Sequence, residues 1–119
     1  MVSCRTDEVA LDDDEVDRLF RALADATRRD ILRRTLAGES TVSELADHYD
    51  MSFAAVRKHV NVLEEAGLIS DHRIGRERRI RGDVDAIRRA QSLLDGFEDI
   101  WRGRIDRLDA LLAEEQHHA

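Results

Sequence analysis

Two short helical segments separated by only three residues constrain the fold of this 119-residue chain more than any other feature. Ser40 or Thr41 can cap the first segment, and with Thr41 as the cap Glu44 completes a capping box. Ser52 can cap the second segment, whose apolar residues keep helical spacing until Gly67. The three residues between the segments leave room for a tight turn only. The sequence therefore predicts a helix-turn-helix motif.

Helical spacing of apolar residues also occurs before this pair. We expect a first helix that begins at Asp14, where acidic residues favour a helix N-terminus. A second helix should follow, with Thr27 as its N-cap and Gly38 in a left-handed conformation at its C-terminal end. Proline, the strongest helix breaker, is absent from the chain. The fold class is therefore mainly α.

The spacing of apolar residues shortens after Gly67. Apolar residues within 68–82 flank the pair Gly75-Arg76, a pattern typical of a β-hairpin. A hairpin that directly follows a helix-turn-helix forms the wing of a winged helix-turn-helix. We therefore predict a winged helix-turn-helix domain over 14–114, with four helices, a small β-hairpin and a fifth helix in that order. A flexible acidic segment should precede it over 1–13.

Helical spacing returns at residue 83 and continues to residue 114. A helix of about 30 residues is roughly 45 Å long, and a domain of this size cannot cover its apolar stripe from end to end. We therefore expect residues 83–114 to form a homodimer with a second copy, leaving 115–119 as a tail. A helix that folds back over its own domain is the alternative. The predicted interface residues lie in the first and last helices and are Val16, Leu19, Phe20, Leu94, Phe97, Trp101, Ile105, Leu108 and Leu112.

Charge is distributed unevenly along the chain, whose net charge is −7. Residues 52–82 hold seven basic and four acidic residues, so a segment with a net charge of +3 lies within an acidic chain. On a helical wheel, the helix 52–66 places its apolar residues on one side and Arg57, Lys58 and Asn61 on the other. A polar face of this kind binds nucleic acid, or it is merely the solvated side of an amphipathic helix.

Arginine and asparagine are the side chains that form paired hydrogen bonds with guanine and adenine in the major groove. We therefore predict that helix 52–66 reads double-stranded operator DNA, while the wing 68–82 lies along the backbone or in the minor groove. Hydroxyls at the start of the third helix suit a phosphate, although capping alone explains them equally well. The predicted DNA-contacting residues are Ser40, Thr41, Ser43, Ser52, Phe53, Ala54, Arg57, Lys58, Asn61, Arg73, Arg76, Arg78 and Arg79.

Three phrases carry a resemblance to a known family, namely LADATRRDIL at 23–32, VSELA at 42–46 and VRKHVNVLEEAGLI at 56–69. In this order and spacing they resemble the ArsR/SmtB family of bacterial winged-helix repressors. The resemblance implies a homodimer built from the first and last helices, with the fourth helix in the major groove of DNA. It also implies release from DNA by an inducer, which the sequence does not identify.

Metal sensors of this family resemble one another in a Cys-x-Cys in the third helix. Here Thr41 and Ser43 stand at those two positions, and hydroxyls do not replace thiolates as ligands for soft metals. The other common metal site uses Asp and His along the last helix, where residues 83–107 contain no histidine. We therefore expect a member of the non-metal-sensing branch, with no metal and no cofactor.

Other classes of function find less support in the sequence. Phosphate-binding loops and nucleophile motifs are missing, so we expect no enzyme. Two alternatives stay open: a sensor of redox state or of a small molecule that uses Cys4 or a pocket beside Trp101, and a protein-interaction module that no longer binds DNA. Apolar runs are short and the first residues are acidic, so we expect a cytoplasmic protein with no membrane partner.

Overall fold

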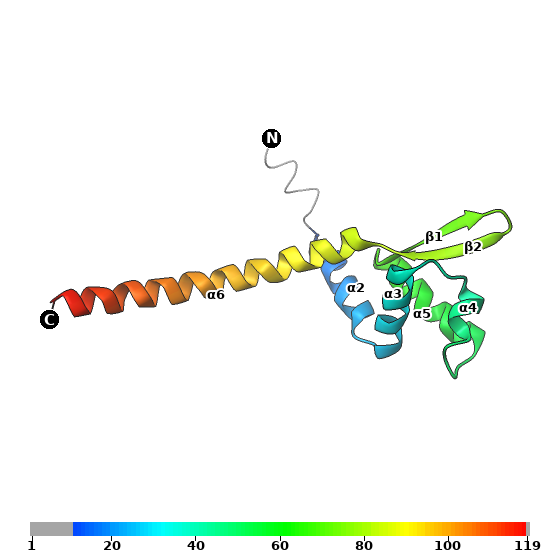
Figure 1. Cartoon of the computed structure of the whole chain (residues 1–119), viewed down its shortest axis with the longest axis horizontal. Helices are drawn as coiled ribbons and strands as arrows, with labels where there is room; N and C mark the ends of the chain where they lie inside the picture. The colour runs from blue at the N-terminus through cyan, green and yellow to red at the C-terminus, as the bar shows by residue number, and fades with distance from the viewer. Residues whose placement is uncertain (1–10, 119) are drawn as a thin grey trace.

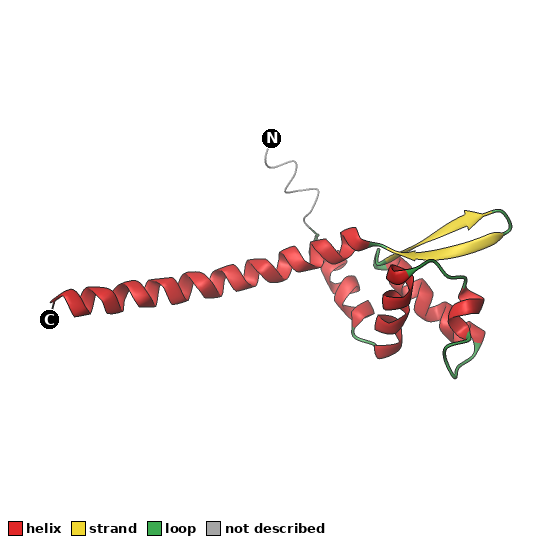
Figure 2. Ribbon diagram, viewed as in Figure 1, coloured by secondary structure: helices red, strands yellow, loops and turns green. Residues whose placement is uncertain are grey.

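In chain order, a two-stranded hairpin lies between the last helix and the preceding helices in the computed structural model, which describes residues 11–118 (Figure 1, Figure 2). The predicted acidic segment 1–13 lies largely outside these residues. The elements are α2 (Asp13–Leu23), α3 (Ala26–Ala37), α4 (Val42–Ala46), α5 (Phe53–Glu65), β1 (Ile69–Ile74), β2 (Glu77–Gly82) and α6 (Val84–His118). This order confirms the predicted fold class, mainly α with a small antiparallel hairpin.

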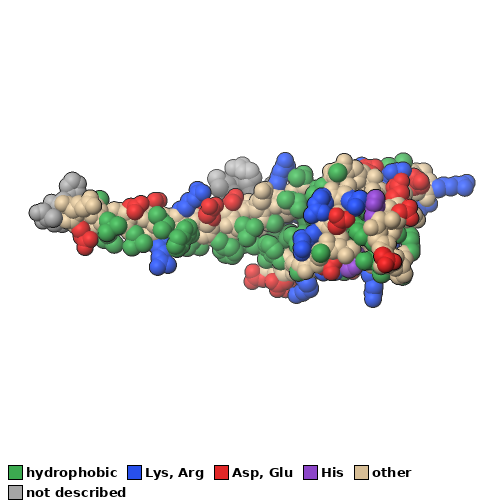
Figure 3. Space-filling model, turned by 60° about the horizontal axis from the view of Figure 1, so that its bottom comes forward, with side chains coloured by type: hydrophobic (Ala, Val, Ile, Leu, Met, Phe, Trp, Pro, Cys, Tyr) green, Lys and Arg blue, Asp and Glu red, His purple; other side chains and the backbone are tan. Residues whose placement is uncertain are grey.

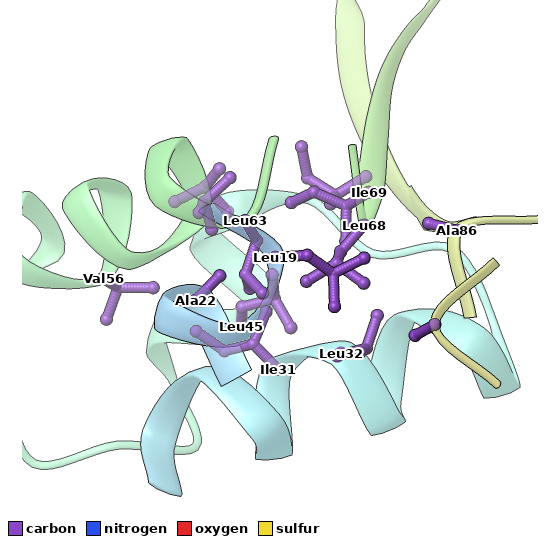
Figure 4. Packing of buried hydrophobic residues seen from close by; sticks show 14 residues of the cluster. Leu19, Ala22, Ile31, Leu32, Leu45, Val56, Leu63, Leu68, Ile69 and Ala86 are labelled. Carbon is purple, nitrogen blue, oxygen red and sulfur yellow. The ribbon is translucent and has the colours of Figure 1, made fainter. Parts of the chain in front are cut away.

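The hydrophobic core lies among the helices and the base of the hairpin (Figure 4). Its largest fully buried aliphatic side chains are Leu19, Ile31, Leu45, Val56, Val60, Leu63, Leu68 and Ile80. Two small residues, Ala86 and Ala90, bring the first turns of α6 against this core. Each large apolar side chain that is fully buried contributes about 1.5–3 kcal/mol. The core therefore holds α5 and the hairpin in one fixed arrangement.

The capping pattern that predicted α4 and α5 is present. The Thr41 hydroxyl accepts a hydrogen bond from the Glu44 N–H at 3.1 Å, and the Glu44 carboxylate accepts one from the Thr41 N–H at 2.8 Å. The Ser52 hydroxyl accepts a hydrogen bond from the Ala55 N–H at 3.1 Å. These bonds satisfy backbone donors that a helix start leaves unpaired. They confirm where the two helices of the helix-turn-helix begin.

Both ends of α3 differ from the prediction. Asp25, and not Thr27, is the N-cap of α3, because its carboxylate accepts a hydrogen bond from a first-turn N–H at 3.0 Å. This bond lowers the pKa of Asp25, and a charged acceptor at a helix N-terminus is stronger than a hydroxyl. Gly38 is extended, with φ −176°, and not left-handed. The chain leaves α3 directly into an extended link, in which Ser40 pairs with Ile80.

The wing is fastened to the helices at its base. β1 and β2 pair antiparallel, and Gly75 adopts a φ of +65° in the turn between them. Backbone hydrogen bonds of 2.7 and 3.1 Å between Ser40 and Ile80 join β2 to the link before α4. A Cβ at Gly82 would lie only 2.7 Å from the Leu36 side chain, so glycine fits where β2 passes α3. The base of the wing therefore keeps a fixed position beside α3 and α4.

The last helix extends far beyond the domain. α6 has 35 residues, which correspond to roughly 52 Å, and it projects away from the other elements (Figure 1). The alternative in which this helix folds back over its own domain is therefore wrong. The tail predicted to begin at residue 115 is also wrong, because α6 continues to His118. Among the described residues, no helix is both long enough and apolar enough to cross a membrane.

Candidate nucleic-acid interface

The two faces of α5 separate as the helical wheel predicted. Val56, Val60 and Leu63 are buried in the core. The opposite side of the helix and its N-cap expose Ser52, Phe53, Ala54, Lys58 and Asn61, with Arg57 half-buried beside them. The residues predicted to contact DNA from this helix therefore share one accessible surface.

A groove lies between the start of α4, the first two turns of α5 and the wing, and we call it the wing groove. The lining residues are Thr41, Val42, Ser43, Phe53, Arg57, Glu77 and Arg78. Most of them were predicted from the sequence to contact DNA, although they come from three separate parts of the chain. The fold thus brings the start of the third helix, the fourth helix and the wing to one surface.

Most arginines that were predicted to bind DNA from the wing have partners within the chain. Arg79 donates a hydrogen bond to Glu77 at 3.0 Å. Arg78 donates through Nε to Asp71 at 3.2 Å, and Arg73 donates to a backbone carbonyl in the turn at 3.3 Å. Sequence reasoning missed Asp71, because the partner of a strand residue depends on the register of the hairpin. These arginines are oriented by the wing and are not freely moving charges.

The remaining basic residues of this surface include one that is paired with another described residue and three that are not. Arg81 pairs with Glu39 in the link before α4, which fastens the wing further. Within the described part of the chain, Arg57, Lys58 and Arg76 take part in no ion pair. Their charge remains available for a negatively charged ligand.

The hydroxyl groups near the wing groove fall into two groups. Thr41 and Ser52 act as caps, and each hydroxyl that accepts a bond retains its own hydrogen for donation. Ser43 is exposed in the first turn of α4. Ser40 is half-buried, and its backbone is paired with β2. Capping is thus present at Thr41 and Ser52, and it leaves hydroxyl donors at the edge of the groove.

A tyrosine in the turn between α4 and α5 anchors the motif to α3. The Tyr49 hydroxyl donates to Asp30 Oδ2 at 2.5 Å, and Arg34 Nε donates to the same oxygen at 2.8 Å. Burial, together with this hydrogen bond, raises the pKa of Tyr49 to about 12, while the bond lowers the pKa of Asp30. The donor and acceptor therefore keep their states around neutral pH. Sequence reasoning missed this link, because 19 residues separate its two ends.

Arg28 connects the start of α3 to both neighbouring helices. Its guanidinium donates to the carbonyls of Arg21 and Ala22 at 3.0 and 2.8 Å, at the end of α2. The same group lies 3.3 Å from His59 Nδ1 on α5. Helix α5 is thus held to the end of α2 through Arg28 and His59.

An apolar stripe follows the projecting part of α6 (Figure 3). Ile100 and Leu111, which the sequence prediction left out, are exposed by 71% and 57% and flank the stripe. In α2, Val16 and Phe20 are half-buried. The prediction for Leu19 is wrong, because this side chain is 1% exposed and fills the core of its own chain. The predicted interface residues on α6 are all 36–60% exposed: Leu94, Phe97, Trp101, Ile105, Leu108 and Leu112.

Thr41 and Ser43, which the resemblance aligns with the Cys-x-Cys of the family's metal sensors, lie at the start of α4. In the part of the chain that the structure describes, no three His, Cys, Asp or Glu side chains are grouped as for a metal ion. Cys4 lies outside that part. Regulation without a metal therefore stays a prediction.

Comparisons with known proteins agree on one family. A family model described as a helix-turn-helix domain matches residues 23–72. The transcriptional repressor SdpR of Bacillus subtilis is 38% identical over 60 residues, which cover 50% of this chain and 67% of SdpR.

Solved structures extend the similarity beyond the helix-turn-helix. The crystal structure of an ArsR family transcriptional regulator is 34% identical, with a TM-score of 0.72, over 78% of this chain and 96% of that one. The homodimeric winged helix-turn-helix DNA-binding domain of a possible ArsR-family regulator from Mycobacterium bovis is 28% identical, with a TM-score of 0.59. That similarity covers 72% of this chain and 80% of the other. This chain therefore belongs to the ArsR family and is a DNA-binding winged helix-turn-helix transcriptional regulator.

Proposed function

We propose that the chain acts as a homodimeric repressor, which inserts α5 into the major groove of an operator and lays the wing along the backbone or minor groove. The observation that carries this proposal is the basic surface of α5 and the wing in an otherwise acidic chain. Phosphates attract this surface, while the acidic remainder repels DNA and thereby favours one docking face. An inducer of unknown chemistry would release the DNA.

The residues of this surface divide into two kinds of contact. Arg57 and Asn61 are suited to form two hydrogen bonds each, with guanine and adenine respectively, so they carry sequence selectivity. Lys58 and Arg76 bind phosphates and add affinity without selectivity. Phe53, which is 54% exposed in the first turn of α5, offers an apolar surface to a thymine methyl group.

The exposed stripe of α6 supports dimerisation. Its contiguous apolar side chains exceed the scattered exposure that is usual for a monomer. A second copy covers both stripes at once, because the same surface patch is present on each chain. The relative from Mycobacterium bovis is homodimeric. We infer that α6 forms the interface together with Val16 and Phe20 of α2. The dimer would then present two copies of α5 to two half-sites of the DNA.

A mobility-shift titration with the duplex upstream of the chain's own gene tests this proposal. If each subunit binds about three phosphates, affinity should fall about 10³-fold between roughly 50 and 200 mM salt, because bound cations are exchanged for protein charges. A random duplex of equal length should bind more weakly. No shift of either duplex at low salt would contradict the proposal and favour a protein-interaction module with the same fold.

A further inference from the structure

The wing buries a carboxylate on the face turned toward the helices. The Asp71 side chain is only 7% exposed. Its Oδ2 atom accepts a hydrogen bond from Arg78 Nε at 3.2 Å, while Oδ1 is buried and has no partner among the described residues. A carboxylate that is only half satisfied costs folding free energy. Packing alone therefore does not explain an aspartate at this position.

The register of the hairpin shows what surrounds this carboxylate. Asp71 lies opposite Ile80, and the next pair toward the tip on the same face is Arg73 with Arg78. Ile69 and Ile80, at the base of this face, are buried in the core. Two arginines directly opposite each other repel. Asp71, one pair away on the same face, supplies the compensating negative charge.

Arg78 occupies a position that suits a contact with DNA. Its side chain is 58% exposed, and it lines the wing groove together with Arg57 and Phe53. Asp71 engages only Nε, and within the described residues neither terminal nitrogen of Arg78 makes a hydrogen bond. A guanidinium held by Nε keeps its planar fork in one orientation and leaves both terminal nitrogens, with four N–H donors, for another ligand. This arrangement binds phosphate oxygens in pairs.

We infer that Asp71 is a positioning residue for DNA binding, which holds Arg78 so that its terminal nitrogens bind one backbone phosphate in the wing groove. The inference rests on the proposed DNA-binding function and adds a residue that does not itself contact DNA. The inference predicts that removal of the Asp71 charge weakens DNA binding, whereas simple electrostatics predicts tighter binding. A carboxylate near DNA repels phosphates, so its removal should tighten binding unless its hold on Arg78 matters more.

The full-length chain and its Asp71→Asn variant test this inference in a salt series, by fluorescence anisotropy on the duplex upstream of the chain's own gene. Asparagine keeps the size of the side chain and removes its charge. We expect the affinity of D71N to fall about tenfold, because a charged hydrogen bond loses its geometry. The salt slope should become shallower by about two, one phosphate contact for each subunit. Unchanged or tighter binding by D71N would overturn the inference.

Two further variants separate positioning from charge. Arg78→Lys keeps the positive charge but has no Nε for Asp71 to hold, so it should lose about as much affinity as D71N. Glu77→Gln removes a negative charge that lines the wing groove and releases Arg79 rather than Arg78, so it should bind more tightly than the wild type. The inference is wrong if R78K binds like the wild type, or if E77Q weakens binding as much as D71N does.

Folding and function are distinguished by two comparisons. An unchanged thermal unfolding midpoint of D71N shows that its loss of affinity does not come from unfolding. If the midpoint of D71N does fall, the DNA affinity of R78K alone tests the inference. Arg78 is exposed, so its replacement leaves the core intact. A wild-type chain without salt-dependent binding would contradict the proposed function as well. A wild-type chain that binds, with variants that bind equally well, would contradict the role of Asp71 only.

Discussion

Replacing Trp101 with glutamate is expected to separate the dimer into monomers and to lower operator affinity about 100-fold. Trp101 lies within the apolar stripe of α6, is 55% exposed and has the Arg104 guanidinium 5.7 Å from its ring centroid. In the dimer, glutamate at this position would replace a large apolar contact with a charge that must lose its water. A monomer reaches only one half-site, so it loses the gain of about 10²–10⁴ that linked binding provides. Sedimentation velocity and fluorescence anisotropy measure the two effects.

Ser92→Glu is the matched control for this variant. Ser92 is exposed on α6, and its distance of nine residues from Trp101 corresponds to two and a half helical turns, which places it on the opposite side. S92E should remain dimeric and bind the operator like the wild type. Circular dichroism should show the same helix content for both variants. A W101E variant that remains a dimer would contradict an interface through α6.

Arg57→Ala should reduce sequence selectivity and leave nonspecific binding nearly intact. The affinity for the operator is expected to fall by about 1–3 kcal/mol, the range for a paired contact with one base. Arg57 lines the wing groove and has no ion pair within the described residues, so its loss leaves no carboxylate without a partner. Anisotropy titrations on the operator and on a random duplex of equal length measure the selectivity ratio.

Arg76→Ala provides the comparison, because Arg76 lies in the turn at the tip of the wing. This variant should weaken binding to operator and random DNA alike and make the salt slope shallower by about one for each subunit. Equal losses on both duplexes for Arg57→Ala would show that α5 does not read bases through this residue.

The helix-turn-helix was predictable because its signals are local. The caps at Thr41 and Ser52 act within three residues of themselves, and the apolar face of α5 follows from helical periodicity. The same local reasoning was wrong at Thr27, because it overlooked the stronger acceptor Asp25 two residues earlier. The capping position depends on which acceptor binds the free N–H groups more strongly. The sequence pattern alone allowed both the Asp25 carboxylate and the Thr27 hydroxyl.

The contacts that orient the wing arginines were not predictable in the same way. Glu77 and Arg79 lie only two residues apart in the sequence, so their ion pair is local. The pairs of Arg78 with Asp71 and of Arg81 with Glu39 join residues that meet only after the hairpin pairs and docks. For Arg78 and Arg81, the pairing of distant segments, and not the local sequence pattern, determines whether the guanidinium has a carboxylate partner.

The dimer surface shows both the strength and the limit of periodicity. An apolar stripe on a long helix predicted the exposed face of α6, since the domain is too small to cover it. The apolar residues of α2 also have helical spacing, but spacing alone does not show whether the same chain or a second copy covers them. In the structure Leu19 belongs to the core of its own chain, while Val16 and Phe20 remain partly accessible.

The central claim is that two copies of this chain bind DNA together through α5. Hydroxyl-radical footprinting on the upstream duplex, combined with stoichiometry from sedimentation equilibrium, tests the claim most directly. We expect two chains for each duplex and two protected segments whose centres lie about 34–36 Å apart, or a multiple of that distance. One chain bound to a single protected segment, or protection without any preference for sequence, would contradict the claim.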